Sequence, residues 1–216
     1  MKQRRESWRW HQPTSILKQG GWLLFLCVGL MLPALASAGA PDSKPGTLGY
    51  YRAPTISGGQ IAFSAGGDLW TVSAKGGLAT QLTNHAGPEI RPRFSPDGKW
   101  LAFSAYFDGD LEVYVMPAKG GAATRLTFRA GPDVVVGWTP DSKHVLFSSM
   151  RRYYHWNTWM YKVALTSKHE VSRVRIGYAS WASFSPDGKH VAFNRSGRET
   201  RNWKRYTGGW SQDIWV

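Results

Sequence analysis

The residue patterns that most enzymes use for hydrolysis or group transfer are missing from this sequence. It contains no G-x-S-x-G elbow, no H-E-x-x-H pair, no C-x-x-C pair and no G-x-x-x-x-G-K-[ST] loop. Nucleophilic catalysis needs a nucleophile beside a base, and the single cysteine, Cys27, lies in an apolar run. We therefore expect no catalytic residue, cofactor or metal ion in this segment.

The acidic and histidine side chains are better explained by structure than by catalysis. Asp97 and Asp187 stand in Pro-Asp-Gly turns. In residues 108–112, DGDLE, every second residue is acidic, as in a calcium-binding loop. The later ligands of an EF-hand are missing, which favours a surface turn. His144 and His190 occupy the same position of a sequence repeat, so they belong to different repeat units rather than to one metal site.

Two segments interleave basic and aromatic side chains and are the candidate contact loops. Such a mixture could stack on nucleic-acid bases, accept the carboxylates of peptides, or dock another domain. The peptide and docking interpretations are favoured over nucleic acid. The candidate residues are Arg151, Arg152, Tyr153 and Trp156 in the first segment, and Arg198, Arg201, Lys204 and Arg205 in the second.

The net charge of +13 permits an acidic partner but does not require one. Of 27 Lys and Arg and 14 Asp and Glu, five bases and one acid precede residue 38, which leaves a net charge of +9. Part of the positive charge therefore belongs to the N-terminal segment.

The first 38 residues have the three parts of a secretory signal peptide. A basic start is followed by an 11-residue apolar run at 22–32 and by the small residues Ala36-Ser37-Ala38. We expect cleavage after Ala38, a linker over 39–49, and an exported periplasmic or extracellular protein with no stable membrane span. An uncleaved membrane anchor and a cytoplasmic location are the alternatives.

A repeat occupies the rest of the chain and predicts its architecture. RFSPDGKWLAF at 93–103 recurs as GWTPDSKHVLF at 137–147 and SFSPDGKHVAF at 183–193, and DLWTVSAKGGLATQLT at 68–83 recurs as EVYVMPAKGGAATRLT at 112–127. Each unit predicts four short strands, with strand one ending at the aromatic residue before S/T-P-D and strand four ending at Leu-Thr. Units of roughly 40–46 residues with four antiparallel strands are typical of β-propeller blades.

The predicted fold is all-β: a partial propeller over 50–216, preceded by a helical signal segment. The expected blades are about 50–87, 88–131, 132–179 and 180–216, the last without its outer strand. About 3.7 blades do not close a ring, so we expect a fragment of a longer protein that self-associates through uncovered apolar faces. A β-sandwich is the alternative, which equal repeats disfavour.

The S-P-D-G-K repeats resemble PD40 or TolB-like blades, which also occur in prolyl-oligopeptidase relatives. Three longer strings resemble the N-terminal propeller of tricorn-type serine proteases: residues 89–128, residues 133–147, and RNWKRYTGGWSQDIW at 201–215. The resemblance implies a non-catalytic propeller that guides or filters oligopeptides towards a catalytic domain, in a parent peptidase that forms homo-oligomers. A TolB-like periplasmic binding scaffold and the propeller of an α/β-hydrolase remain alternatives.

Overall fold

The computed structural model describes residues 50–151, 157–195 and 213–216. Every regular element in these segments is a strand, as the repeat predicted. Within the same segments no helix is both long enough and apolar enough to cross a membrane. The predicted signal peptide at 1–38 and the linker at 39–49 lie outside the described residues.

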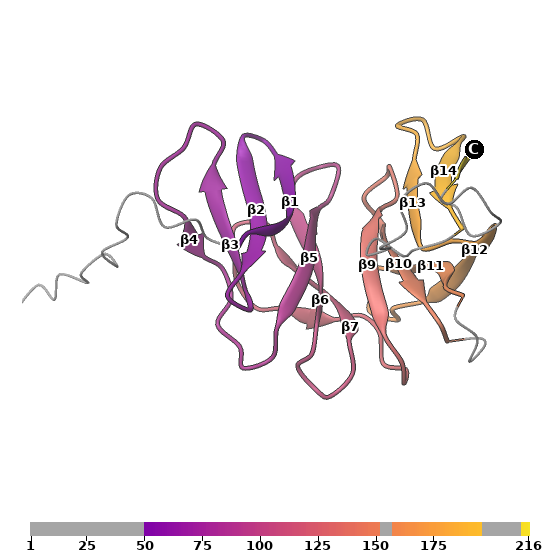
Figure 1. Ribbon diagram of the computed structural model, residues 1–216, viewed down its shortest axis with the longest axis horizontal. Coiled ribbons are helices and arrows are strands. Elements are labelled where there is room, and N and C mark those ends of the chain that lie inside the picture. The colour runs from indigo at the N-terminus through magenta and orange to yellow at the C-terminus, as the bar shows by residue number, and fades with distance from the viewer. Residues whose placement is uncertain (1–49, 152–156, 196–212) are drawn as a thin grey trace, which may run out of the picture. The chain divides into compact units, whose positions relative to one another are not determined.

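The strands form antiparallel sheets in chain order, one for each repeat unit (Figure 1). The first sheet contains β1 (Arg52–Ser57), β2 (Gln60–Ala65), β3 (Asp68–Ser73) and β4 (Thr80–Gln81). The second contains β5 (Glu89–Phe94), β6 (Trp100–Ala105), β7 (Glu112–Pro117) and β8 (Thr124–Arg125). The third contains β9 (Asp133–Trp138), β10 (His144–Ser149), β11 (Trp159–Ala164) and β12 (Val171–Tyr178). The fourth contains β13 (Trp181–Phe184), β14 (Val191–Asn194) and β15 (Ile214–Trp215).

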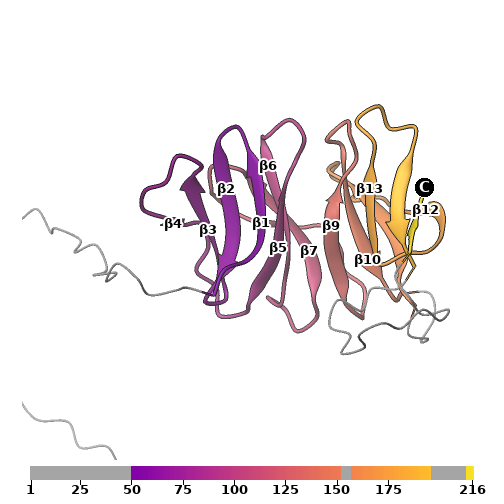
Figure 2. The ribbon, with the colours of Figure 1, turned by 45° about the horizontal axis from the view of Figure 1, so that its top comes forward.

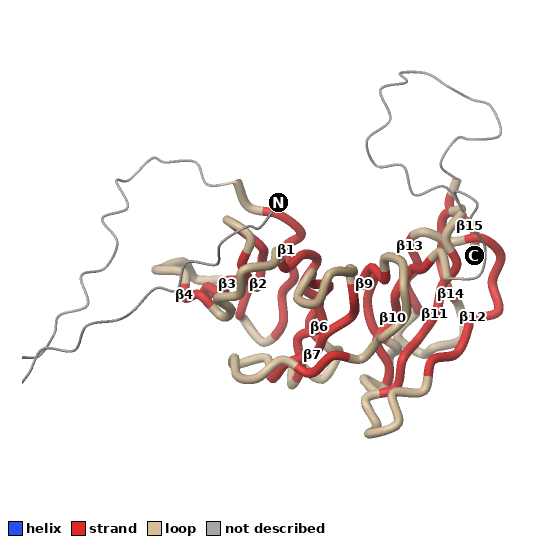
Figure 3. The backbone as a smooth tube through the Cα atoms, turned by 90° about the horizontal axis from the view of Figure 1, so that it is seen from below, coloured by secondary structure: helices blue, strands red, loops and turns tan. Residues whose placement is uncertain are grey.

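These sheets are the blades of a propeller, and their first strands lie side by side. β5 contacts β1 and β9, and β13 contacts β9, so the first strand of each blade is its inner strand (Figure 2). Figure 3 shows the same succession of blades from below the view of Figure 1. The fourth blade has three strands among the described residues, with β15 at its edge. The predicted partial propeller is confirmed.

Side chains on both faces of the middle blades are buried, which explains why their strands lack a clean polar and apolar alternation. In β7, Val113 and Val115 pack into a cluster with the third blade, whereas Tyr114 and Met116 pack into a cluster with the first. A third cluster joins β10 and β11 to the fourth blade. Burial between blades therefore requires bulky residues at successive strand positions.

The outer strands of the first two blades are shorter than predicted. β4 and β8 end before the Leu-Thr pair instead of at it. In the first blade the hydroxyl of Thr83 accepts the N–H of Leu69 at 2.8 Å, and Thr127 accepts the N–H of Val113 at 2.9 Å in the second. A side chain thus replaces the backbone acceptor that a longer strand would supply.

Candidate functional site

The S/T-P-D turns hold the inner strands in place through a repeated hydrogen-bond pattern. Ser95 Oγ donates to Asp97 Oδ1 at 2.5 Å, and the same carboxylate oxygen accepts the N–H of Lys99 at 3.1 Å. Ser95 Oγ also accepts the N–H of Trp100 at 3.0 Å. These bonds favour the ionised carboxylate, so the Ser95 hydroxyl first and then the Lys99 N–H lower the pKa of Asp97. Thr139 with Asp141 and Ser185 with Asp187 repeat the arrangement.

One of these turns also reaches the neighbouring blade. Its third-blade copy has Ser142 at a φ of 59°, where the other two turns have Gly98 and Gly188 at 70° and 72°. A left-handed φ suits glycine better than serine. The Ser142 hydroxyl, however, accepts the N–H of Asp97 from the second blade at 3.1 Å. The serine thus gains a bond between blades that glycine does not offer.

Two inner strands are bulged at equivalent positions. Ala53 in β1 and Arg91 in β5 have positive φ values of 49° and 57°, and the strand register shifts at both places. Residues with a Cβ adopt this conformation at a cost of roughly 1–2 kcal/mol. Strained residues of this kind cluster at functional sites, so the surface formed by the inner strands is a candidate functional site.

Arg93 connects three blades at this surface. Its Nε donates to the carbonyl of Val136 in the third blade at 3.3 Å, and its Nη1 donates to the carbonyl of Ala53 in the first at 3.4 Å. Nη1 also donates to Pro92 O at 2.9 Å. In return, Trp138 Nε1 donates to the Arg93 carbonyl at 2.8 Å. The side chain is therefore fixed by backbone carbonyls from its own and both neighbouring blades.

Among the described residues, Arg93 contributes to the lining of three pockets. The largest, about 510 Å3, has the apolar side chains of Val136, Trp138, Trp181, Phe193 and Ile214. The second, about 460 Å3, is lined by Arg52, Ala53, Ser64, Ile90, Arg91, Arg93 and Trp181. The third, also about 460 Å3, lies beside the turn prolines Pro96, Pro140 and Pro186. The inner-strand surface thus offers an apolar, a basic and a proline-lined pocket around one arginine.

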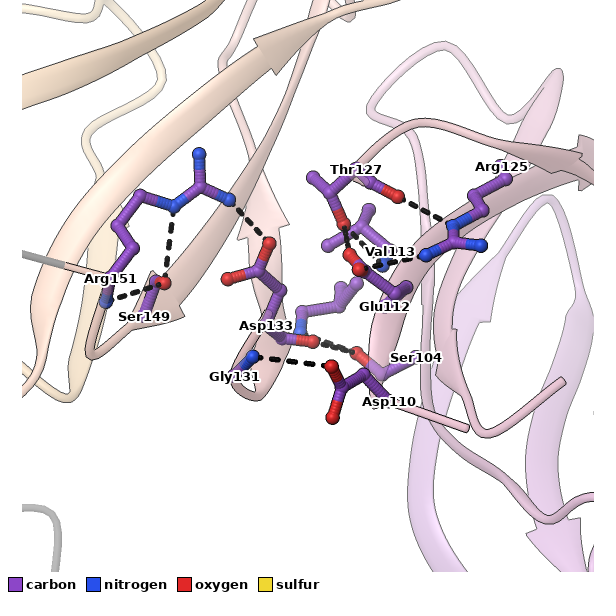
Figure 4. A network of polar contacts seen from close by, with 11 residues as sticks. Ser104, Asp110, Glu112, Val113, Arg125, Thr127, Gly131, Asp133, Ser149 and Arg151 are labelled. Carbon is purple, nitrogen blue, oxygen red and sulfur yellow. Dashed lines mark hydrogen bonds and ion pairs between the residues drawn. The ribbon is translucent and has the colours of Figure 1, made fainter. Parts of the chain in front are cut away.

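A second polar group is a buried network between the second and third blades (Figure 4). Glu112 accepts hydrogen bonds from Thr127 Oγ1 and, at 2.9 Å, from Arg125 Nη2. Arg125 also pairs with Asp108 at 3.0 Å, so acids of the DGDLE segment are neutralised by an arginine. In the described residues no group of three or more His, Cys, Asp or Glu side chains could hold a metal ion.

Arg151 belongs to the same region, and its guanidinium forms an ion pair with the buried carboxylate of Asp133. Its Nε donates to Ser149 Oγ at 3.2 Å, and its Cζ lies 4.9 Å and 5.0 Å from the ring centres of Phe147 and Tyr161. The side chain is 10% exposed. Its charge is therefore engaged inside the third blade, and the peptide-facing or docking role predicted for it stays a prediction.

The other seven predicted contact residues lie outside the described residues. They are Arg152, Tyr153, Trp156, Arg198, Arg201, Lys204 and Arg205. Their role also stays a prediction.

Glu89 occupies the position in β5 that Asp133 occupies in β9, but it has no arginine partner in the described structure. Its Oε2 accepts the Thr83 hydroxyl at 2.8 Å, while its buried Oε1 has no hydrogen-bond partner there. Burial is the main reason that the pKa of Glu89 rises to about 7. This carboxyl is a structural group at a blade junction, and it titrates near neutral pH.

Sequence reasoning missed the inner-strand arginines Arg52, Arg91 and Arg93. The contact residues predicted from the sequence lie instead in the long loops, where basic and aromatic residues are dense. A usable signal was present, because residues just before the S-P-D turn must lie on the inner strand of a propeller blade. Two of these arginines stand in EIRPRF, directly before such a turn.

The fold and the inner-strand site define a propeller of four-stranded antiparallel blades. Comparison with known families identifies it further, because residues 48–216 match the family described as the tricorn protease N-terminal beta propeller domain. The chain belongs to this family.

Two tricorn relatives support this assignment. The tricorn protease homolog of Saccharolobus solfataricus is 28% identical over 173 residues, which cover 77% of this chain and 16% of that protein. The crystal structure of the tricorn protease superposes with a TM-score of 0.67 at 25% identity, over 77% of this chain and 17% of that one. The chain covers only between 5% and 29% of the length of the curated relatives that it matches.

The fold is shared more widely. The crystal structure of TolB from Acinetobacter baumannii has a TM-score of 0.56 at 23% identity, over 68% of this chain and 38% of that chain. At this identity the likeness shows the fold alone.

Proposed function

We propose that this chain is the non-catalytic N-terminal propeller of a tricorn-type serine peptidase, and that its inner-strand surface guides or filters oligopeptides towards a catalytic domain elsewhere in the protein. The observation that carries the proposal is the set of pockets around Arg93, on the strands that line a propeller's axis. Family membership supplies the link to a peptidase.

The chemistry of the pockets suits peptides of mixed sequence. The 510 Å3 pocket combines aromatic and aliphatic walls with the polar groups of Asn194 and Ser183. Pockets of about 300–1,000 Å3 with apolar walls and a few polar groups are typical of ligand sites. Side chains of a passing peptide would occupy such pockets while its backbone stays solvated.

Photo-crosslinking tests the proposal directly. A pentapeptide with a central benzoylphenylalanine, capped at both ends, is irradiated with the chain, and the adducts are mapped by mass spectrometry. We expect adducts on β9, β13 and β14, and no hydrolysis of the peptide. Adducts confined to the outer strands β4, β8 and β12, or turnover that survives repurification, would contradict it.

Export of the protein is part of the proposal. The basic start, apolar run and Ala36-Ser37-Ala38 site support removal of residues 1–38 and a periplasmic or extracellular location. Mass spectrometry of exported protein should find Gly39 as the first residue. An intact Met1 in membrane fractions would instead indicate an anchor.

The proposed partners are the downstream protease domains and further copies of the full-length protein. A TolB-like periplasmic scaffold is the second candidate, because the S-P-D-G-K repeats also resemble TolB-like blades. The coding sequence after Val216 separates the two. A peptidase domain there supports the first candidate, whereas a chain that ends soon after ring closure supports the second.

A further inference from the structure

The second pocket around Arg93 is lined by two more arginines than either of the other two. Among its described lining residues are three arginines, Arg52, Arg91 and Arg93, and no carboxylate. They come from two blades, because Arg52 lies on β1 and the other two on β5. A concave site with charges of one sign attracts ligands of the opposite charge.

Backbone carbonyls and aromatic rings are among the groups that orient these guanidinium groups. Arg93 is held by the carbonyls of Ala53, Pro92 and Val136. The Cζ of Arg91 lies 4.1 Å from the ring centre of Trp181, and that of Arg52 lies 4.2 Å from the ring of Tyr50. Stacking on an aromatic face leaves the donor edges of a guanidinium directed sideways, where they match a carboxylate.

Both β5 arginines have further interactions beyond these contacts. A guanidinium has five N–H donors, so a ligand can add to existing contacts without displacing them. The left-handed φ of Arg91, at 57°, is a second sign that this position is constrained for more than strand pairing.

We infer that this pocket binds carboxylate groups of peptides, so that the propeller favours acidic oligopeptides over neutral and basic ones. The inference rests on the proposed peptide-guiding function and adds a substrate class to it. The carboxylate can come from a Glu or Asp side chain or from the C-terminus of the peptide. The guanidinium groups of Arg52, Arg91 and Arg93 supply the charge-assisted hydrogen bonds, and Trp181 supports that of Arg91.

Fluorescence anisotropy with four labelled pentapeptides tests the inference on the full chain. Three are capped at both ends and carry three central Ala, Glu or Lys residues, and the fourth is the Ala peptide with a free C-terminal carboxylate. We expect the Glu peptide to bind most tightly, and Arg91→Gln to weaken it by about tenfold, the loss expected for one charge-assisted bond. The fourth peptide reports whether a C-terminal carboxylate is accepted too.

Two further variants make the result specific. Arg52→Gln is the second test, because Arg52 is exposed and its loss should leave folding intact. Lys99→Gln removes the same charge from a side chain that is 76% exposed and outside the pocket, and should leave the affinity for the Glu peptide within twofold. Circular dichroism and thermal melts verify that each variant is folded.

The outcomes separate this inference from the proposed function. Equal affinity for capped Ala and Glu peptides would overturn the inference and leave peptide guiding in place. Equal losses in Arg91→Gln, Arg52→Gln and Lys99→Gln would also overturn it, because the effect would then be one of net charge. If none of the peptides binds, both ideas fail.

Discussion

Trp138 Nε1 donates a 2.8 Å hydrogen bond to the main-chain carbonyl of Arg93, and so joins the inner strands of the second and third blades. The Arg93 side chain returns a bond to the carbonyl of Val136, two residues before Trp138. Each strand therefore both donates to and accepts from its neighbour. The wall of the inner-strand pockets depends on this reciprocal pair.

Replacing Trp138 by Phe should destabilise the chain by about 1–3 kcal/mol, because the partly buried Arg93 carbonyl loses its donor. Urea unfolding monitored by circular dichroism measures the change. Trp100→Phe is the control, since Trp100 is 37% exposed and begins β6, directly after the turn that follows Phe94. Equal losses in both variants would show that aromatic packing, and not the hydrogen bond, decides the effect.

Glu89→Gln should stabilise the chain at pH 8 and have a smaller effect at pH 5. Burial raises the pKa of Glu89 from 4.5 to about 7, so between these values the folded state retains a proton that the unfolded state releases. Stability of the wild type therefore falls as pH rises through this range. Urea unfolding at the two pH values checks this.

Glu112→Gln is the control for Glu89→Gln. Glu112 is paired with Arg125 at 2.9 Å, so its neutralisation should lower stability at pH 8. An unchanged difference between wild type and Glu89→Gln at pH 5 and pH 8 would mean that Glu89 does not titrate in this range.

Asp141→Asn should reduce the loss of stability that the wild type suffers in acid. The Thr139 hydroxyl and then the Lys143 N–H lower the pKa of Asp141 below its ordinary value of 3.8. The stabilisation is present above 3.8 and is lost as pH falls through the folded-state pKa. Thermal melts from pH 6 to pH 2.5 test this, with the exposed Glu170→Gln as control. Identical pH profiles for both variants would contradict it.

Arg151→Met should destabilise the chain by about 3–5 kcal/mol, because the buried Asp133 carboxylate loses its counter-charge. The double variant Arg151→Met with Asp133→Asn should recover much of that loss. Chemical denaturation of both variants and the wild type measures the difference. If Arg151→Met is as stable as wild type but binds peptides less tightly, Arg151 acts in binding and not in blade structure.

The exposed edge of the fourth blade should promote association of the 216-residue chain. Ile214 and Val216 are 80% and 85% exposed, and β15 pairs only with β14 among the described strands. Unpaired apolar edges drive strand addition. Light scattering over a concentration series should show growth that Ile214→Lys reduces. A compact monomer at every concentration would refute this.

The blades could be predicted from the sequence because local chemistry determines them. Each S/T-P-D motif closes its turn with bonds between residues at most five apart, such as Trp100 N–H to Ser95 Oγ. The repeat spacing then requires equal blades, and apolar residues on both faces require neighbours to cover them. The ends of β4 and β8 were missed, because Thr83 and Thr127 act across a blade through their side chains.

The site depended on contacts that no local pattern encodes. Glu89 is the first residue of β5 and Asp133 is the first residue of β9, so the two hold equivalent positions. Glu89 pairs with Ala105, two residues before Phe107, whereas Asp133 pairs with Ser149, two residues before Arg151. This difference gives Asp133 a counter-charge that Glu89 does not have among the described residues, and burial raises the pKa of Glu89 to about 7. The chain's composition and repeats thus determine its family and its blades. Only the tertiary structure, which brings β1, β5 and β9 side by side, decides which charges are neutralised in the interior and which arginines line a pocket.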